Sequence, residues 1–400
     1  MEYLFEKFLN KLDRLAVAFS RYLLSTIDWN NRMIGIKGAR GTGKTTLLLQ
    51  YAYFYLPHDH RTLYVSLDDF YFTEYHIVEL VREFVLQGGR YLLLDEVHRY
   101  PSWSTELKNI YDDDPDLQVI FTGSSVLHIN KARGDLSRRA VMYELPGLSY
   151  REFLNLKFCY SFSPVAWQTL VTDHTAVARK IKNDIRPLEY FQSYLNNGYY
   201  PYFTDNEEPY KQKLKETIEL AIHVDLPSFF DISHQSLEKL RKLLFILYGS
   251  APFTPNIKKL SERMGVTRNT LIEYLGYLDE LRVIKRLYTS TKGVGLLQKP
   301  DKLMIYHPNF QYALSQHPPE TGSIRESFFV NQVSQFARVR NARQGDFQVD
   351  VNVFEIGGKR RQTDKFKMLV MPLLFPMILR LGLKTRSPYG YLGFCIRMIE

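Results

Sequence analysis

The feature that most limits how this chain can fold is a glycine-rich segment, Gly38–Thr45 (GARGTGKT), set between two apolar segments of different periodicity. The residues before it, 32–37 (RMIGIK), predict a β-strand, and those after it, 46–56 (TLLLQYAYFYL), have the apolar spacing of a helix. A strand, a glycine-rich loop and a helix in this order are typical of a phosphate-binding P-loop. The chain is therefore expected to hold an α/β domain.

The residue types of this loop predict how it binds a nucleotide. Glycines allow backbone N–H groups to surround a β-phosphate, and the following helix points its positive end at the same group. Lys44 is expected to reach the β- and γ-phosphates, and the Thr45 hydroxyl to bind Mg²⁺. The other interpretation is a glycine-rich turn that carries a lysine by chance. The expected nucleotide-binding residues are Gly38, Gly41, Thr42, Gly43, Lys44, Thr45 and Thr46.

An acidic pair follows a second buried-strand pattern. Residues 90–94 (RYLLL) end directly on Asp95 and Glu96. Open α/β sheets bind their ligands at the carboxyl ends of their strands. Asp95 is therefore expected to support Mg²⁺, and Glu96 to orient or deprotonate the water that attacks the γ-phosphate. Taken alone, the pair also fits a solvated helix cap.

A third strand, 118–122 (QVIFT), ends in Gly-Ser-Ser. Thr122 and Ser124 are both candidates for a hydrogen bond to the γ-phosphate or the attacking water, because the sequence does not say which side chain faces the site. A turn that caps the next helix is an equally good interpretation for each of them. Residues 62–66 and 141–145 predict two further strands.

Together these segments resemble the bacterial and archaeal AAA-type ATPases that carry a C-terminal domain of uncharacterised function. The resemblance rests on 38–50 (GARGTGKTTLLLQ), on 91–125 from YLLLDEVHRYP to VIFTGSS, and on 135–153 with DLSRRA and GLSYREF. It implies binding and hydrolysis of ATP with Mg²⁺, a prokaryotic source and a five-stranded parallel sheet. In that sheet the third strand would lie between the P-loop strand and the Asp95 strand.

Members of this group often complete the site with a cationic side chain, supplied by the same subunit or by a neighbour. Arg138 and Arg139 lie where such a residue is expected, and Arg40 inside the P-loop is a weaker alternative. The other interpretation of Arg138 and Arg139 is that they are solvated or paired with Asp135.

The resemblance and the local patterns divide the chain into six parts. The fold class we expect is a P-loop NTPase with a helical lid, followed by a winged helix-turn-helix and a small α+β C-terminal domain. The parts are an N-terminal helix (1–30), the ATPase core (31–147), the lid (148–236), the winged helix (237–312), a truncated C-terminal domain (313–360) and a tail (361–400).

The winged helix is predicted from a short helix at 257–264, a turn at Gly265 and a second helix that Thr267 caps. Residues 256–302 contain ten Lys and Arg against five Asp and Glu. Two interpretations remain open. The module binds DNA, or it serves as a packing or protein-docking module. The residues expected to contact DNA are Arg268, Asn269 and Lys292.

The segment 323–359 resembles a domain that looks like a restriction endonuclease in many relatives. Glu326, Asp350 and Glu355 are the nearest matches to its acidic positions. The lysine expected two residues after the last acid is replaced by Gly357. Nuclease chemistry is therefore not expected.

The tail, residues 361–400, has neither helical nor strand periodicity and has prolines inside its apolar run. Read one base out of frame, 387–396 allows PLWLFGFLY, which resembles the ending of relatives. Our hypothesis is that this tail is the product of a shifted reading frame. The tail holds seven Lys and Arg against two Asp and Glu, so more than half of the net charge of +9 lies in it. Any polyanion binding is therefore expected to be local to the winged helix.

The remaining composition indicates a cytoplasmic protein. Cys159 and Cys395 are too few for a disulfide framework or a four-ligand zinc site. The N-terminus lacks the order of a signal peptide, and the longest apolar run, 368–379, is too short to span a membrane. A homo-oligomer or another protein partner is compatible with the sequence.

Overall fold

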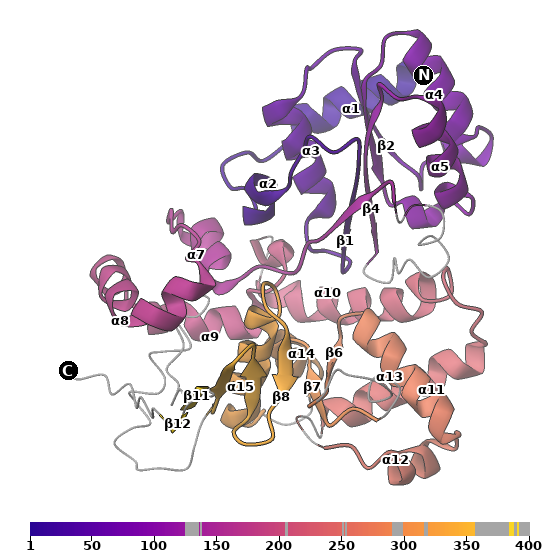
Figure 1. Cartoon of the computed structure of the whole chain (residues 1–400). Helices are drawn as coiled ribbons and strands as arrows, with labels where there is room; N and C mark the ends of the chain where they lie inside the picture. The colour runs from indigo at the N-terminus through magenta and orange to yellow at the C-terminus, as the bar shows by residue number, and fades with distance from the viewer. Residues whose placement is uncertain are drawn as a thin grey trace. The chain divides into compact units, whose positions relative to one another are not determined.

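The computed structural model describes residues 1–124, 136, 138–204, 207–249, 252, 254–289, 299–315, 319–356, 384–387 and 390–391. The chain forms two compact units (Figure 1). The first contains Met1–Gly147 and His223–Asp231, and the second contains Leu148–Ile222 and Ile232–Glu400. The segment 223–231, expected to belong to the lid, thus packs with the first unit. Within the described part of the chain, no helix combines the length and apolar character needed to cross a membrane.

A five-stranded parallel sheet forms the centre of the first unit, as the sequence predicts. Its order is β2-β3-β4-β1-β5. The predicted place of β4, between the P-loop strand β1 and the Asp95 strand β3, is confirmed. This order brings the carboxyl ends of β1, β3 and β4 together at one edge. The strands are β1 (Met33–Gly38), β2 (Thr62–Ser66), β3 (Tyr91–Asp95), β4 (Gln118–Ser124) and β5 (Val141–Glu144).

Both faces of this sheet are covered, because each buried strand sends alternate side chains to opposite sides. Leu63 and Val65 join one hydrophobic cluster, whereas Tyr64 between them joins the other. In Figure 1, α4 and α5 lie on one side of the sheet, and α1 and α3 on the other. The helices are α1 (Glu2–Asp13), α3 (Lys44–Tyr55), α4 (Ile77–Leu86) and α5 (Trp103–Asp113), with short 3₁₀ turns η1 (Phe70–Thr73) and η2 (Val97–Arg99).

The single N-terminal helix that we expected is divided into α1 and a separate α2 (Tyr22–Thr26). Gln50 on α3 is buried and donates its side-chain amide to the carbonyl oxygens of Ala16, at 3.0 Å, and Phe19, at 2.7 Å. A continuous helix would use these carbonyls in its own hydrogen bonds. The buried amide therefore favours the non-helical path between α1 and α2.

The second unit is mainly helical, with two small antiparallel sheets. One sheet is the pair β6-β7, and the other has the order β12-β11-β10-β9-β8. Its helices are α7 (Tyr150–Phe158), α8 (Trp167–Asp184), α9 (Pro187–Asn197), η3 (Pro201–Thr204), α10 (Glu207–Leu220), α11 (His234–Tyr248), α12 (Ile257–Met264), α13 (Arg268–Glu280), α14 (Pro308–Leu314) and α15 (Thr321–Val333). A single π-helical turn, η4 (Ala221–Asp225), connects α10 to the segment 223–231.

Buried aromatic and polar side chains around α14 form the core of the second unit. Asn309 is fully buried, and its amide oxygen accepts hydrogen bonds from the Tyr199 N–H at 2.8 Å and the Tyr210 hydroxyl at 2.6 Å. Its amide nitrogen donates to the carbonyls of Tyr194 and Leu195. Tyr194, Tyr199 and Tyr210 are therefore core residues, and Asn309 satisfies backbone groups that packing alone would leave unpaired.

The helix pair predicted at 257–281 is present. α12 ends at Gly265 in the left-handed conformation, with a φ of 60°, and the Thr267 hydroxyl caps α13 by accepting from the Thr270 N–H. The antiparallel strands β6 (Ile284–Leu287) and β7 (Lys302–Ile305) follow. Lys292, expected to contact DNA, lies outside the described residues.

The C-terminal sheet contains β8 (Val339–Asn341), β9 (Phe347–Val349), β10 (Asn352–Phe354), β11 (Lys384–Ser387) and β12 (Gly390–Tyr391). β9 and β10 form a hairpin around a two-residue turn in which Asp350 has a φ of 52°. β11 and β12 are the described parts of the tail, and β11 pairs with β10. The rest of the segment on which the shifted-frame hypothesis depends lies outside the described residues.

Candidate functional site

The loop between β1 and α3 has the backbone geometry that its glycines allow. Gly41 and Gly43 have φ values of 82° and 92°, a region where a side chain is strained. At Gly38 the limit is space, because a Cβ atom there would lie 2.4 Å from the carbonyl oxygen of Leu145. The chain thus reverses from β1 into α3 in a turn that only these glycines fit well.

Arg21, on the segment before α2, fixes the position of this loop. The side chain is 5% exposed, and its guanidinium donates to the Thr42 carbonyl at 2.7 Å and to the Pro146 carbonyl at 2.8 Å. It therefore joins the P-loop to the end of the sheet beyond β5. The Thr42 hydroxyl adds a hydrogen bond inside the loop, donating to the Ala39 carbonyl at 2.9 Å.

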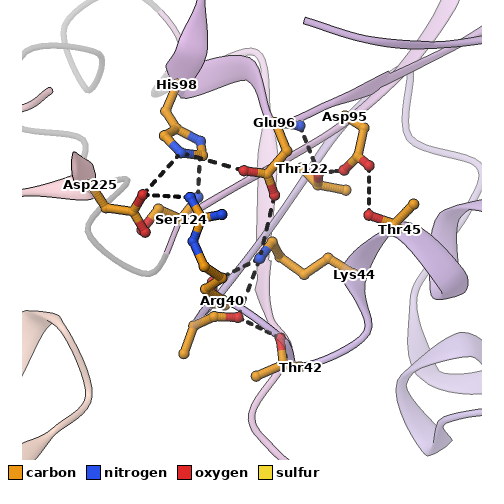
Figure 2. A network of polar contacts seen from close by, with 12 residues as sticks. Arg40, Thr42, Lys44, Thr45, Asp95, Glu96, His98, Thr122, Ser124 and Asp225 are labelled. Carbon is orange, nitrogen blue, oxygen red and sulfur yellow. Dashed lines mark hydrogen bonds and ion pairs between the residues drawn. The ribbon is translucent and has the colours of Figure 1, made fainter. Parts of the chain in front are cut away.

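Lys44 is the first residue of α3, and its side chain is folded back over the loop (Figure 2). It is 4% exposed, and its ammonium group donates to the carbonyls of Gly38 at 3.1 Å and Ala39 at 3.3 Å. The same ammonium lies 3.8 Å from the Glu96 carboxylate. A cation held over the loop in this way is suited to bind phosphate oxygens.

Asp95 at the end of β3 accepts three side-chain hydrogen bonds. The Thr45 hydroxyl donates at 2.6 Å and the Tyr64 hydroxyl at 2.8 Å to Oδ2, and the Thr122 hydroxyl donates to Oδ1. Burial, together with the Asp95 charge, raises the pKa of Tyr64, so its hydroxyl stays a donor. Asp95 itself is 2% exposed, so its carboxylate is held in one orientation next to Thr45.

Glu96 directly follows β3 in the left-handed backbone conformation, with φ 53° and ψ 41°. This conformation is uncommon for a residue with a side chain and costs of order 1–3 kcal/mol. The Glu96 N–H donates to the Thr122 hydroxyl at 3.2 Å, which helps to hold it. The Glu96 side chain is directed between Lys44 and His98, away from Thr45 (Figure 2).

His98, in η2, lies on the other side of Glu96. Its Nε2 is 3.4 Å from Glu96 Oε2, and its Nδ1 accepts a long hydrogen bond, 3.4 Å, from the Ser124 N–H. Asp225 comes from the segment 223–231, and its Oδ1 lies 3.8 Å from His98 Nε2 and 2.8 Å from Arg40 Nη2. Residues from the P-loop, β3, β4 and a distant part of the sequence thus meet here.

Cationic side chains surround the Asp225 carboxylate. Burial acts to raise the pKa of this carboxyl, but the neighbouring His98 and Arg40 more than offset burial and hold its pKa below the usual range. The Arg99 guanidinium, 3.8 Å away, adds a second cation. On the other side of His98, the Phe229 ring stacks at a centroid distance of 5.9 Å. Asp225 is therefore an ionised, buried anchor for this segment.

The donor set at this edge fits a nucleotide with Mg²⁺. One hydroxyl and one carboxylate, Thr45 and Asp95, touch each other, and Mg²⁺ commonly takes one or two protein oxygens and completes its shell with water and phosphate oxygens. In the described part of the chain, no group of three His, Cys, Asp or Glu residues is arranged to hold a metal by itself.

The other predicted site residues lie as follows. Thr46 is exposed on the first turn of α3, and Ser124 contributes its backbone N–H to His98. Arg138 is exposed, whereas Arg139 donates to both carboxylate oxygens of Asp112 on α5. Asp112 is thus one acidic partner of Arg139, and Asp135, the partner considered from the sequence, lies outside the described residues.

Four residues of the site were missed by sequence reasoning: Arg21, Tyr64, His98 and Asp225. Tyr64 had a usable signal, because it lies in β2, the strand that neighbours β3, two residues before the last residue of β2. His98 follows the acidic pair within three residues and had a weaker signal. Arg21 and Asp225 had none, because only the folded chain brings them to the P-loop.

The strand order, the loop between β1 and α3 and the acidic pair after β3 define an α/β fold of the P-loop NTPase class. Residues 30–154 match the model of an AAA domain, so the first unit contains an AAA-type P-loop domain. Residues 188–316 match a domain of unknown function (DUF8612) that covers α9 to α14.

The chain is similar to an uncharacterized protein of Methanocaldococcus jannaschii, with 27% identity over 298 residues. The match covers 69% of this chain and 62% of that relative. It is also similar, at 15% identity and a TM-score of 0.31, to the Orc1 protein of Aeropyrum pernix in complex with DNA, over 72% of this chain and 87% of that one. AMPPCP-bound DnaA from Aquifex aeolicus matches at 17% identity and a TM-score of 0.24, over 69% and 86%.

Proposed function

We propose that this chain binds ATP with Mg²⁺ and hydrolyses it slowly, and that the ATP cycle drives a conformational switch. The observation that carries the proposal is the convergence of Lys44, Thr45, Asp95 and Glu96 at one edge of the sheet. Lys44 would bind the phosphates, and Thr45 and Asp95 would hold Mg²⁺. Bound Mg²⁺ supplies charge compensation for the phosphates.

The Glu96 carboxylate is the group we assign as base. It lies beside the Lys44 ammonium and is not part of the Thr45–Asp95 pair that would hold Mg²⁺. It therefore remains available to accept a proton from the attacking water. Proton transfer and Mg²⁺ binding would then be carried out by different carboxylates, Glu96 and Asp95. Thr122 supports both, because its hydroxyl donates to Asp95 and accepts from the Glu96 N–H.

Two variants test this proposal. Lys44→Ala should abolish ATP binding, because it removes the buried ammonium group that lies over the P-loop. Glu96→Gln should leave binding intact, slow hydrolysis by about 100-fold and trap bound ATP. The matched control is Glu83→Gln on the exposed face of α4, which should behave as wild type. Normal hydrolysis by Glu96→Gln would disprove the role of Glu96.

The arginine that completes the site stays a prediction. Arg138 is exposed and is the one we would test in a neighbouring subunit, since Arg139 is paired with Asp112. Arg40 lies in the P-loop and is paired with Asp225. Mixing Arg138→Ala chains with Lys44→Ala chains should restore activity only if the arginine acts between subunits, because each Lys44→Ala chain can then supply its Arg138 to the intact nucleotide site of a neighbour.

A second candidate function is DNA binding by the helix pair α12–α13 and the strands β6–β7, which we interpret as a winged helix. Arg268 and Asn269 are exposed on the first turn of α13. Nearby, a hollow of about 530 Å³ is lined by four cationic side chains and one acidic one; its charged lining is Lys239, Arg241, Lys242, Arg263 and Glu238. This favours a polyanion. ATP binding would then act as a switch on DNA binding.

Duplex binding with a steep salt dependence, lost in Arg268→Ala, would support this second function. Protein docking is the alternative, and partner binding would then survive Arg268→Ala and Lys292→Ala. Nuclease activity is not proposed, because Gly357 stands where the lysine of a nuclease site is expected. An ATPase assay with and without DNA separates the candidates.

A further inference from the structure

His98 is a buried histidine that the proposed roles of Lys44, Asp95 and Glu96 do not use. It is 7% exposed, and its Nδ1 accepts from the Ser124 N–H, a group that can only donate. A neutral ring in this position therefore carries its proton on Nε2. Nε2 is buried and makes no hydrogen bond with good geometry to the residues that the structure describes. Its nearest acceptors are oxygens of Glu96 and Asp225.

A buried N–H without an acceptor is unfavourable, so small movements that bring an acceptor to His98 Nε2 are favoured. Asp225 is already engaged, because its Oδ1 accepts from Arg40 at 2.8 Å. Glu96 Oε2, at 3.4 Å, needs only a slight side-chain rotation to accept. The arrangement therefore favours Glu96 as the partner of Nε2.

Glu96 has a second neighbour, Lys44, 3.8 Å from Oε1. If Lys44 binds phosphates as proposed, its ammonium group interacts with the nucleotide and no longer with Glu96. His98 is then the group left to hold the carboxylate. Without a hydrogen bond from His98, the Glu96 side chain would sample several rotamers. A general base is effective only within hydrogen-bond reach of the water.

We propose that His98 is a positioning residue that orients the Glu96 carboxylate through its Nε2–H, and that Asp225 keeps the His98 ring in place. The inference rests on the proposed ATP hydrolysis. Asp225 belongs to the segment 223–231, which is flanked on both sides by residues of the second unit. The position of the Glu96 side chain thus depends on how the segment 223–231 packs, and this segment is not part of the P-loop motif.

The test compares two amides that replace different nitrogens of His98. Glutamine places its amide N–H near the Nε2 position, whereas asparagine reaches only the Nδ1 position. His98→Ala and His98→Asn should lower kcat by about 10–100-fold with KM changed less than about twofold, as expected for a residue that supports a catalytic group. His98→Gln should recover most of the rate.

A double variant shows whether His98 acts through Glu96. In the Glu96→Gln background, His98→Ala should cause no further loss of kcat, because the carboxylate it orients is absent. Binding of a fluorescent ATP analogue should be unchanged in all His98 variants. Hydrogen exchange of 223–231 should increase in Asp225→Asn, and thermal unfolding identifies any variant that fails to fold.

The outcomes separate this inference from the proposed function. If wild type does not hydrolyse ATP, or Glu96→Gln matches wild type, the proposed function fails. If both behave as proposed and His98→Ala is fully active, only the role of His98 is overturned. Additive losses in the double variant, or a His98→Gln no better than His98→Asn, would also overturn it. If His98→Ala is unfolded, the comparison of glutamine with asparagine decides.

Discussion

Tyr64→Phe isolates one hydrogen bond of the proposed magnesium site. The ring is 3% exposed and packs in the hydrophobic cluster between the sheet and the helices α1 and α3. Phenylalanine therefore keeps the packing and removes only the hydroxyl. That hydroxyl donates to Asp95 Oδ2 at 2.8 Å. A hydrogen bond to a charged group contributes about 1.5–3 kcal/mol, which corresponds to about 10–150-fold in an equilibrium constant.

The direction of the effect follows from the remaining partners. A carboxylate has about four acceptor positions, so the hydroxyls of Thr45, Tyr64 and Thr122 leave a position free for a metal ion. Without Tyr64, Asp95 keeps donors from Thr45 and Thr122 but loses the one that comes from β2. Its orientation becomes less fixed, and losses of this kind typically weaken metal binding by about 10–100-fold. Both estimates predict that Mg²⁺ binding weakens by at least about tenfold.

The assay is a Mg²⁺ titration of ATP hydrolysis, repeated as a titration of fluorescent-nucleotide binding. The half-saturating Mg²⁺ concentration should rise at least about tenfold in Tyr64→Phe, with kcat at saturating Mg²⁺ less affected. The control is Tyr51→Phe, which removes a hydroxyl from another buried tyrosine whose hydroxyl bonds to Gln118. An unchanged or lower Mg²⁺ requirement in Tyr64→Phe would refute the reasoning.

Three further predictions concern the second unit and the tail. Burial holds the pKa of His307 well below its usual range, so the unfolded chain binds a proton that the folded chain excludes. Stability should therefore fall by up to about 1.4 kcal/mol per pH unit below about pH 6.5, and urea unfolding of His307→Gln should show a weaker dependence. Asn309→Ala removes four buried hydrogen bonds and should destabilise by about 4 kcal/mol, against less than about 0.5 for Asn196→Ala in the same urea assay. Resequencing of the gene should reveal a shifted frame before 361–400, and mass-spectrometric peptides matching the printed tail would contradict it.

The sheet of the first unit could be predicted closely because its signals are local. Most of these strands are short, nearly continuous apolar runs, the pattern of a strand buried on both faces, and the glycines mark where β1 must turn. The division of the N-terminal segment could not be predicted in this way. It depends on Gln50, which lies on α3, about thirty residues further along the chain.

The candidate site divides along the same line. Lys44, Thr45, Asp95 and Glu96 belong to motifs in which residue type and spacing carry the chemistry. Asp225 lies 185 residues from Arg40 and has no motif around it. Its role appears only when the chain has folded, because burial next to two cations and a histidine is a property of the tertiary structure.

The backbone at Glu96 explains why two adjacent carboxylates can serve different purposes. In a regular strand, neighbouring side chains point to opposite faces of the sheet, so Asp95 and Glu96 would be separated by the sheet itself. The left-handed conformation at Glu96 ends the strand and keeps both carboxylates at its edge, one towards Thr45 and one towards His98. Glutamine has nearly the same backbone preferences as glutamate. Glu96→Gln therefore tests the loss of the carboxylate and not a change of the turn, which is why a substitution to glycine or alanine would be the weaker experiment.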